Sequence, residues 1–140
     1  MSKIYDTHQV LNEYSFARYS CILKPDDSFE WIGQNLLDSE DHDWRSEFNS
    51  IVGKIKKEDS STEANYKFTF VVDSASGESR SYAYASGPKH YKPQDFQGEM
   101  KEDGKVLEVS FGREPIILKL SSNAKPLATK DLIYPDFLFD

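Results

Sequence analysis

The dipeptide Asp103-Gly104 constrains the fold more than any other feature of this sequence. Asp-Gly is favoured in two-residue type I′ hairpin turns, because both central positions of that turn require positive φ. A turn centred here places the flanking apolar side chains on one face of a hairpin, in the pairs Met100–Leu107, Gly98–Val109 and Phe96–Phe111. On the other face Glu99 meets Glu108. A slip of one residue would move every side chain to the opposite face, so the sequence predicts this register.

Alternating segments extend the hairpin into a sheet. The Gly112–Pro115 segment predicts a turn into a third strand, with the pairs Phe111–Ile116, Val109–Leu118 and Leu107–Leu120. Residues 66–72 and 80–84 also alternate, and the turn-rich segment 73–78 between them predicts a second hairpin. Strands are also expected over residues 14–23 and, interrupted by Pro135, over residues 131–140.

Two segments show helical spacing instead. Asp27 and Glu30 resemble a capping arrangement before apolar residues at helical intervals, which predicts a helix over residues 28–37. A single apolar stripe predicts a second helix over residues 43–57, with its members Trp44, Phe48, Ile51, Val52 and Ile55. Gly53 inside this helix costs about 1 kcal/mol relative to Ala, or it marks close contact with a neighbouring segment.

The predicted fold class is therefore α+β. We expect an antiparallel sheet of five to seven strands with two helices packed on one face, because strands follow a helix pair without βαβ alternation. This two-layer arrangement resembles the NTF2-like and cystatin-like folds in architecture only, since no residue motif assigns a family. No internal repeat or linker divides the chain, so residues 1–140 are expected to form a single domain.

The charge of the chain is concentrated in one window. The formal net charge is −7, and the window from Asp26 to Glu47 alone holds eight acids and one base. Such a field repels nucleic-acid phosphates and attracts basic proteins. The ordinary alternative is that these acids serve helix starts and solubility. If they bind a partner, the candidate residues are Asp38, Glu40, Asp41, Asp43 and Glu47.

Two further groups of residues are candidates for binding. The long segment 87–95 is a crossover loop or a recognition loop, and in the second case its contact residues are Lys89, His90, Tyr91 and Lys92. A pocket between sheet and helices would use Arg80, Tyr82 and Tyr84. The three histidines are far apart in the sequence, and the only cysteine, Cys21, is expected to be a buried small hydrophobe. We predict no catalytic residue, metal ligand or cofactor.

These observations support hypotheses from different functional classes. The first is a non-enzymatic protein-binding module, for example a cytosolic inhibitor, immunity protein or antitoxin that uses its acidic surface against a basic partner. The second is a small-molecule-binding protein or cofactor-free enzyme with its pocket between sheet and helices. The third is an accessory subunit that docks through the apolar residues 137–139. The N-terminus lacks the apolar stretch of a secretory signal, so the expected location is cytoplasmic, without membrane association.

Overall fold

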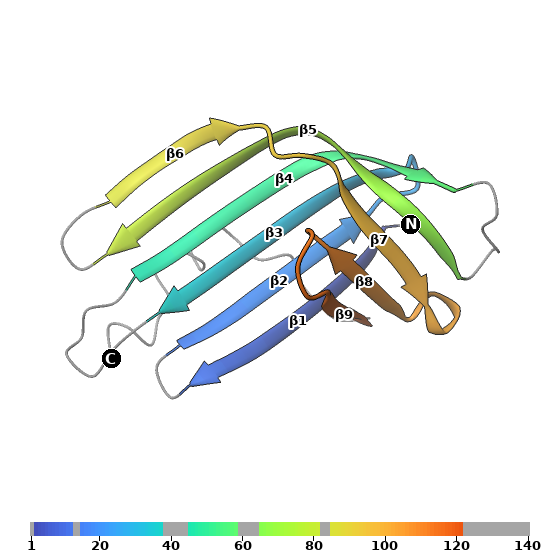
Figure 1. Cartoon of the computed structure of the whole chain (residues 1–140), viewed down its shortest axis with the longest axis horizontal. Coiled ribbons are helices and arrows are strands. Elements are labelled where there is room, and N and C mark those ends of the chain that lie inside the picture. The colour runs from blue at the N-terminus through green and yellow to red at the C-terminus, as the bar shows by residue number, and fades with distance from the viewer. Residues whose placement is uncertain (1, 13–14, 38–44, 59–64, 82–84, 122–140) are drawn as a thin grey trace.

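The computed structural model describes residues 2–12, 15–37, 45–58, 65–81 and 85–121. These residues form nine strands and one short 3-10 turn (Figure 1). In chain order the strands are β1 (Lys3–Asn12), β2 (Ser15–Leu23), β3 (Ser28–Leu37), β4 (Arg45–Lys57), β5 (Tyr66–Ser81), β6 (Ala85–Tyr91), β7 (Phe96–Lys101), β8 (Val106–Ser110) and β9 (Ile116–Ser121). Across the described ranges no helix is long and apolar enough to cross a membrane.

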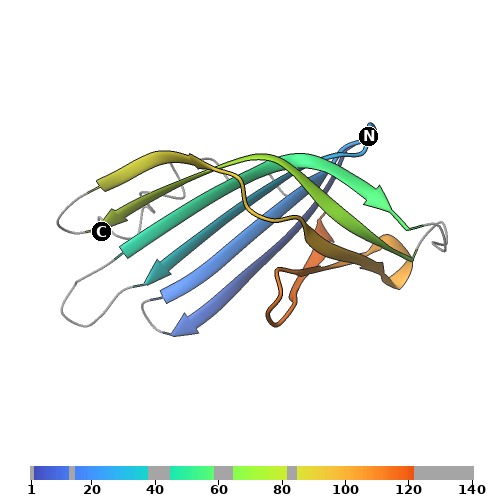
Figure 2. The same cartoon turned by 45° about the horizontal axis from the view of Figure 1, so that its top comes forward.

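The strands close into an antiparallel barrel. Eight of them form a ring in the order β1-β2-β3-β4-β5-β7-β8-β9, which the pairing of β9 with β1 completes. β6 adds to the second half of β5 and lies outside the ring. At one end, which holds the β2–β3 and β7–β8 turns, all eight strands meet, and we call it the closed end. At the other, open end, β1 to β6 continue as a curved sheet (Figures 1 and 2).

The hydrophobic core fills the inside of the closed end. Every strand of the ring contributes inward side chains, and aromatic rings stack or meet edge-on in the centre. The phenyl rings of Phe70 and Phe96 stack at 4.4 Å between centroids. The completely buried side chains of this core include Tyr5, Cys21, Phe68, Phe70, Leu107, Val109 and Leu118. The interior is thus occupied by protein side chains, as in other small barrels.

The predicted hairpin is confirmed from Gln97–Ser110 to Lys101–Val106, whereas the predicted pair Phe96–Phe111 is not part of the ladder. β7 and β8 pair in the expected register, with Met100 opposite Leu107 and Gly98 opposite Val109. Asp103 and Gly104 have φ of 58° and 84°, the positive values that this turn requires. The amide of Lys105 donates to the carbonyl of Glu102 at 3.2 Å and closes the turn.

The predicted register of the next hairpin is wrong by two residues. Ile116 lies opposite Val109, and Leu118 lies opposite Leu107. The same side chains still point to the inner face, because side chains alternate along a strand and a shift of two residues does not change their face. Phe111 leaves the ladder as a result: its side chain is 42% exposed, although its ring stacks on Phe96 at 4.3 Å.

The α+β fold class is wrong, because the segment predicted as a helix over residues 28–37 is the strand β3. Phe29 and Trp31 point into the barrel core, whereas Ile32 and Leu36 are buried on the opposite face. A strand buried on both faces carries apolar residues at odd and even positions, so its spacing imitates a helical stripe. The carboxylate of Asp26 accepts hydrogen bonds from the amide and hydroxyl of Ser28 in a turn, not in a helix cap.

The helix predicted over residues 43–57 is likewise wrong, since residues 45–57 form β4. Phe48 and Ile51 lie on opposite faces of this strand, and their helical interval has no meaning for its packing. The alternative interpretation of Gly53 is confirmed. A Cβ at this position would lie 2.0 Å from the carbonyl oxygen of Val71, where the pairing of β4 with β5 shifts register.

The hairpin predicted over residues 66–84 is one long strand in its described part. β5 runs through the expected turn and pairs with β4 from Phe68 to Ser81. Its first half pairs with β7 and its second half with β6. The turn-forming residue Asp73 is absorbed as the extra residue of the irregularity opposite Gly53.

Candidate functional site

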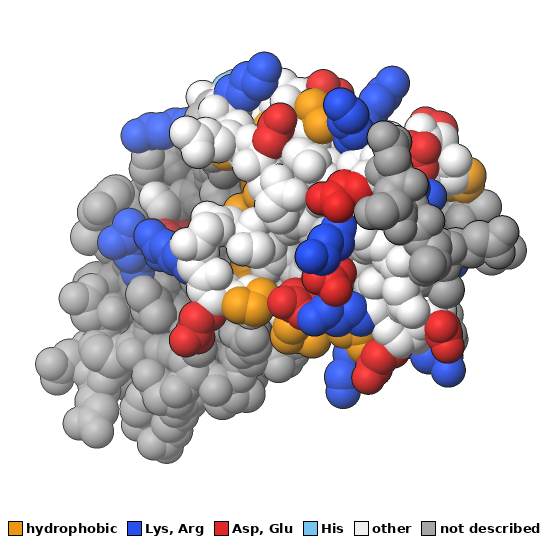
Figure 3. Space-filling view, turned by 45° about the vertical axis from the view of Figure 1, so that its right-hand side comes forward, with side chains coloured by type: hydrophobic (Ala, Val, Ile, Leu, Met, Phe, Trp, Pro, Cys, Tyr) orange, Lys and Arg blue, Asp and Glu red, His pale blue; other side chains and the backbone are white. Residues whose placement is uncertain are grey.

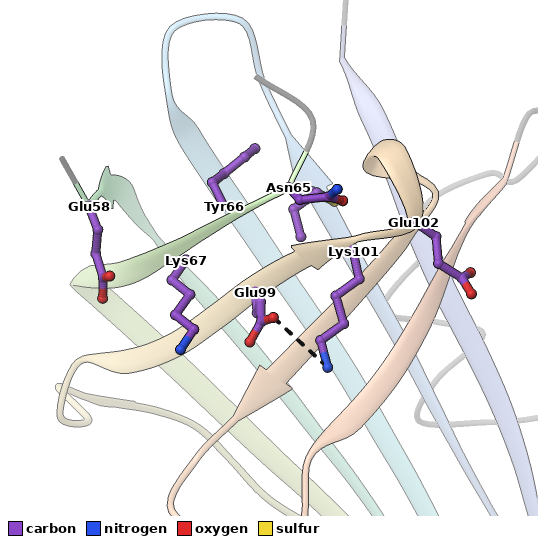
Figure 4. Close-up of a pocket in the computed structure, with 8 residues that line it drawn as sticks. Glu58, Asn65, Tyr66, Lys67, Glu99, Lys101 and Glu102 are labelled. Atoms are coloured by element: carbon purple, nitrogen blue, oxygen red, sulfur yellow. Dashed lines mark ion pairs between the residues drawn. The ribbon is translucent and has the colours of Figure 1, made fainter. Parts of the chain in front are cut away.

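A charged groove runs along the outer face of β5, β7 and β8 at the closed end (Figures 3 and 4). It consists of two adjoining hollows, of about 530 Å³ and 270 Å³, which share Glu58, Lys67 and Glu99. We define the charged groove by its ionisable residues, Glu58, Lys67, Glu99, Lys101, Glu102 and Glu108. With four carboxylates and two ammonium groups, its formal charge is 2 − 4 = −2.

The strand register places two like charges directly opposite each other in this groove. Glu99 on β7 faces Lys67 on β5 on one side and Glu108 on β8 on the other. Directly opposed side chains in antiparallel strands have Cβ atoms about 5 Å apart, and like charges at that separation are unfavourable. The Glu99–Glu108 pair is therefore a site where additional positive charge is stabilising.

Lys101 supplies part of that charge. Its ammonium group lies 2.5 Å from a carboxylate oxygen of Glu108. It also lies 4.0 Å from a carboxylate oxygen of Glu99, a contact drawn in Figure 4. The hydrogen bond to Glu108 raises the pKa of Lys101 above its ordinary value. One ammonium group thus serves two carboxylates, and the cluster of Glu99, Lys101 and Glu108 retains one net negative charge.

One backbone hydrogen bond and one glycine hold the groove in place. The amide of Glu58, just after β4, donates to the carbonyl of Lys67 at 3.1 Å. Between the groove and the core, Gly98 leaves room for the rings beneath it, since a Cβ there would lie 2.5 Å from Phe68 and 2.7 Å from Phe70. The charged side chains are therefore presented on a sheet whose inner face is tightly packed.

The predicted acidic window does not form a single face in its described part. Asp26 and Asp27 lie in the β2–β3 turn at the closed end, whereas Glu47 faces Asn35 on β3 toward the open end. Asn35 is eight residues beyond Asp27, a distance of about 26 Å along a strand. Glu47 forms an ion pair with Arg45 at 2.6 Å. The other predicted contact residues, Asp38, Glu40, Asp41 and Asp43, lie outside the described residues.

The remaining predicted site residues are only partly described. Lys89, His90 and Tyr91 belong to the strand β6, so the segment expected as a loop is a loop only from Lys92 to Asp95. Lys89, His90 and Lys92 are exposed. Arg80 lies in β5, and Tyr82 and Tyr84 lie outside the described residues. A pocket between sheet and helices is wrong for the described chain, because its sheet closes on itself without a helix layer.

Cys21 lies where the sequence predicts it, completely buried in a strand. Burial raises the pKa of its thiol well above the usual range, which keeps it protonated at neutral pH. His90 is exposed on β6, whereas Cys21 has no exposed surface.

Sequence analysis missed the charged groove as a site, although it paired Glu99 with Glu108. The signal was available in the alternation of the hairpin, whose outer positions hold Glu99, Lys101 and Glu108. The sequence did not predict that Lys67 and Glu58 lie beside these three residues, because the pairing of β5 with β7 was not predicted. Comparison with known proteins adds no relative, since no family model, curated protein or solved structure matches the chain.

Proposed function

We propose that this protein is a non-enzymatic binding module that recognises a basic segment of a partner protein through the charged groove. The observation that carries the proposal is the directly opposed pair Glu99–Glu108, which shares the single ammonium group of Lys101. A lysine or arginine from a partner would neutralise the remaining charge. The carboxylates are partly exposed, so they are accessible while still held by neighbouring strands.

The shape of the groove agrees with this function. It is open and elongated across three strands, which suits a peptide segment better than an enclosed small molecule. Charge complementarity of this kind acts mainly on the rate of association and weakens with salt. We keep the cytoplasm as the proposed compartment, where a cytosolic inhibitor, immunity protein or antitoxin would meet its partner.

The experiment measures the association of a lysine- and arginine-rich peptide at low and high ionic strength. The variant Glu58→Gln/Glu99→Gln removes two charges from the groove, and Glu30→Gln/Glu114→Gln removes two charges elsewhere. We expect the groove variant to bind about tenfold more weakly at low salt, from a loss of roughly 0.7 kcal/mol per contact. If both variants lose affinity equally, the peptide responds only to net charge and the groove is not the site.

The segment from Asp38 to Glu47 remains a second part of this proposal. Glu47, the one acidic residue of this segment that the structure describes, lies toward the open end, away from the charged groove. The variant Asp38→Asn/Glu40→Gln/Asp41→Asn should slow association with a basic partner and flatten its salt dependence if this segment takes part. An unchanged rate at low salt would restrict the binding surface to the charged groove.

A further inference from the structure

The mouth of the closed end is a second hollow, which adjoins the charged groove at Tyr66 and Met100. Its volume is about 530 Å³. Tyr66 and Lys67 are neighbours on β5, yet Tyr66 lines the mouth and Lys67 projects from the opposite side of the strand (Figure 4). The mouth is bordered by the start of β1, the β2–β3 turn, the end of β4, the start of β5 and the β7–β8 turn.

The floor of the mouth is apolar and does not continue into a channel. Leu23 and Met100 are buried members of the core, and Ile55 packs against them. Below them the barrel is filled by side chains without exposed surface, such as Phe68 and Leu107. A ligand would therefore rest an apolar body on this floor and remain at the surface.

Two phenolic hydroxyls stand beside this floor. The hydroxyl of Tyr5 donates to the carbonyl of Gly104 at 2.8 Å, which ties β1 to the β7–β8 turn. Tyr66 lies under the ammonium group of Lys57, 4.7 Å from its ring centroid. Burial raises the pKa of both phenols, and the nearby carboxylate of Asp27 raises that of Tyr66 further. Both side chains therefore stay neutral at physiological pH.

The rim carries more positive than negative charge. Lys3, Lys24 and Lys57 reach it from three different elements, against the carboxylates of Asp27 and Asp103. Within the described part of the chain, none of these lysines forms an ion pair. The ammonium group of Lys24 acts on the neighbouring carboxylate of Asp26, but no described carboxylate oxygen lies within 4.0 Å of any of the three ammonium groups.

The two rim turns are held in place by hydrogen bonds from segments that adjoin them in the ring. Asp27 has a positive φ of 64°, and its carbonyl accepts a hydrogen bond from the amide of Ile55 at 2.8 Å. The amide of Asp103 donates to the side-chain oxygen of Asn65 at 3.0 Å. A rim fixed in this way loses little conformational entropy when a ligand binds.

We propose that the mouth binds an organic anion with an apolar body, of the carboxylate or sulfonate class. The anionic group meets the ammonium groups of Lys3, Lys24 and Lys57, and the apolar body covers Leu23, Ile55 and Met100. Barrel mouths with an apolar lining and a few convergent polar groups are preferred ligand sites. This site is separate in chemistry from the charged groove, which carries the opposite net charge.

The test uses octanoate and octyltrimethylammonium, which share an apolar chain and differ in charge. Each is titrated into the labelled protein, and the amide NMR signals of Leu23, Ile55 and Met100 report on the floor of the mouth. We expect octanoate to produce saturable shifts at these amides, and octyltrimethylammonium to bind at least tenfold more weakly. Equal affinity for the two amphiphiles, or no saturable shift with octanoate, would overturn the proposal.

Variants separate the mouth from the general surface. Lys3→Gln/Lys24→Gln removes two rim charges that make no described ion pair, so folding should be unaffected. It should weaken octanoate about tenfold, since a charge-assisted contact contributes on the order of one power of ten. Lys89→Gln/Lys92→Gln removes two exposed charges away from the mouth, so it is the matched control and should bind as the wild type does. Wild-type affinity in the double variant would exclude the mouth as an anion site.

Discussion

Single glycines report how closely this barrel is packed. A Cβ at Gly53 would meet the backbone of β5 at 2.0 Å, one at Gly98 would meet the buried ring of Phe68 at 2.5 Å, and one at Gly33 would meet the partly exposed ring of Tyr19 at 3.0 Å. Backbone cannot move aside as a side chain can, so alanine should destabilise most at Gly53 and least at Gly33. We expect losses of roughly 3 kcal/mol or more at Gly53 and about 1–3 kcal/mol at Gly98. Urea midpoints of the three variants give the order, and a Gly33 variant as unstable as that of Gly53 would contradict it.

Tyr5 makes stability depend on pH in the alkaline range. Burial, with the nearby Tyr66 and Cys21, raises its pKa to about 12 from an ordinary 10.0. Below pH 10 the phenol is protonated in both states and the shift has no effect on stability. Between pH 10 and 12 only the unfolded chain releases this proton, so the folded state loses stability as pH rises.

Replacing Tyr5 with Phe should remove this part of the pH dependence. At neutral pH the variant loses the hydrogen bond to Gly104, at a cost of about 1 kcal/mol. Between pH 10 and 12 its free energy of unfolding should fall by roughly 2 kcal/mol less than that of the wild type. Denaturant unfolding at several alkaline pH values measures the difference. Parallel curves for the two proteins would show that Tyr5 titrates normally.

At the scale of elements, the β7–β8 hairpin combines a defined turn with a buried inner face. Val109 is completely buried opposite Gly98, whereas Ser110, its neighbour, points to the outer face. Val109→Ala should therefore cost about 1–3 kcal/mol. Ser110→Ala, the control in the same strand, should change stability by about 0.5 kcal/mol or less. Equal effects in thermal unfolding would contradict the buried face.

Local signals explain which elements the sequence predicts correctly. The β7–β8 register followed from two residues with special backbone needs and from alternating side chains, both of which are local. β3 was mistaken for a helix because both faces of this strand are buried, which removes the alternation. In β4 the buried side chains change from one face to the other between Phe48 and Ile51, which gives them a helical interval. The β-branched Ile51, Val52 and Ile55 favoured a strand by propensity and Gly53 disfavoured a helix, but the helical interval outweighed these signals.

The candidate sites depend on pairings between distant segments, which explains why they were not predicted. Lys67 meets Glu99 through the β5–β7 ladder, and Tyr5 meets Gly104 across the barrel. The alternating hydrophobic pattern predicts which face of a strand is buried, but it does not predict which other strand pairs with it. The charge count, by contrast, correctly located the acidic window in the sequence. In the structure, the length of β3 separates the described acidic residues at the two ends of this window.

At the scale of the whole molecule, the barrel is held shut by a short ladder. β1 and β9 pair at three positions, from Ile4 to Asp6, whereas β3 and β4 pair at ten. Local opening should therefore begin at the β1–β9 seam. In native-state hydrogen exchange we expect the amides of β9 to exchange faster than those of β3 that pair with β4. Slower exchange in β9 than in β3 would mean that the seam is not the weak point.

Because β1 pairs with β9, the barrel can close only after both strands have been synthesised. β1 is synthesised before its partner β9, which ends at Ser121, more than a hundred residues after the end of β1. At roughly 5–20 residues per second, the N-terminal strands wait on the order of ten seconds for that partner. During this interval β1 and β2 can pair locally while one edge of β1 stays open to other chains. Until β9 is synthesised, a chaperone that covers this edge of β1 would keep the nascent chain from pairing with other chains.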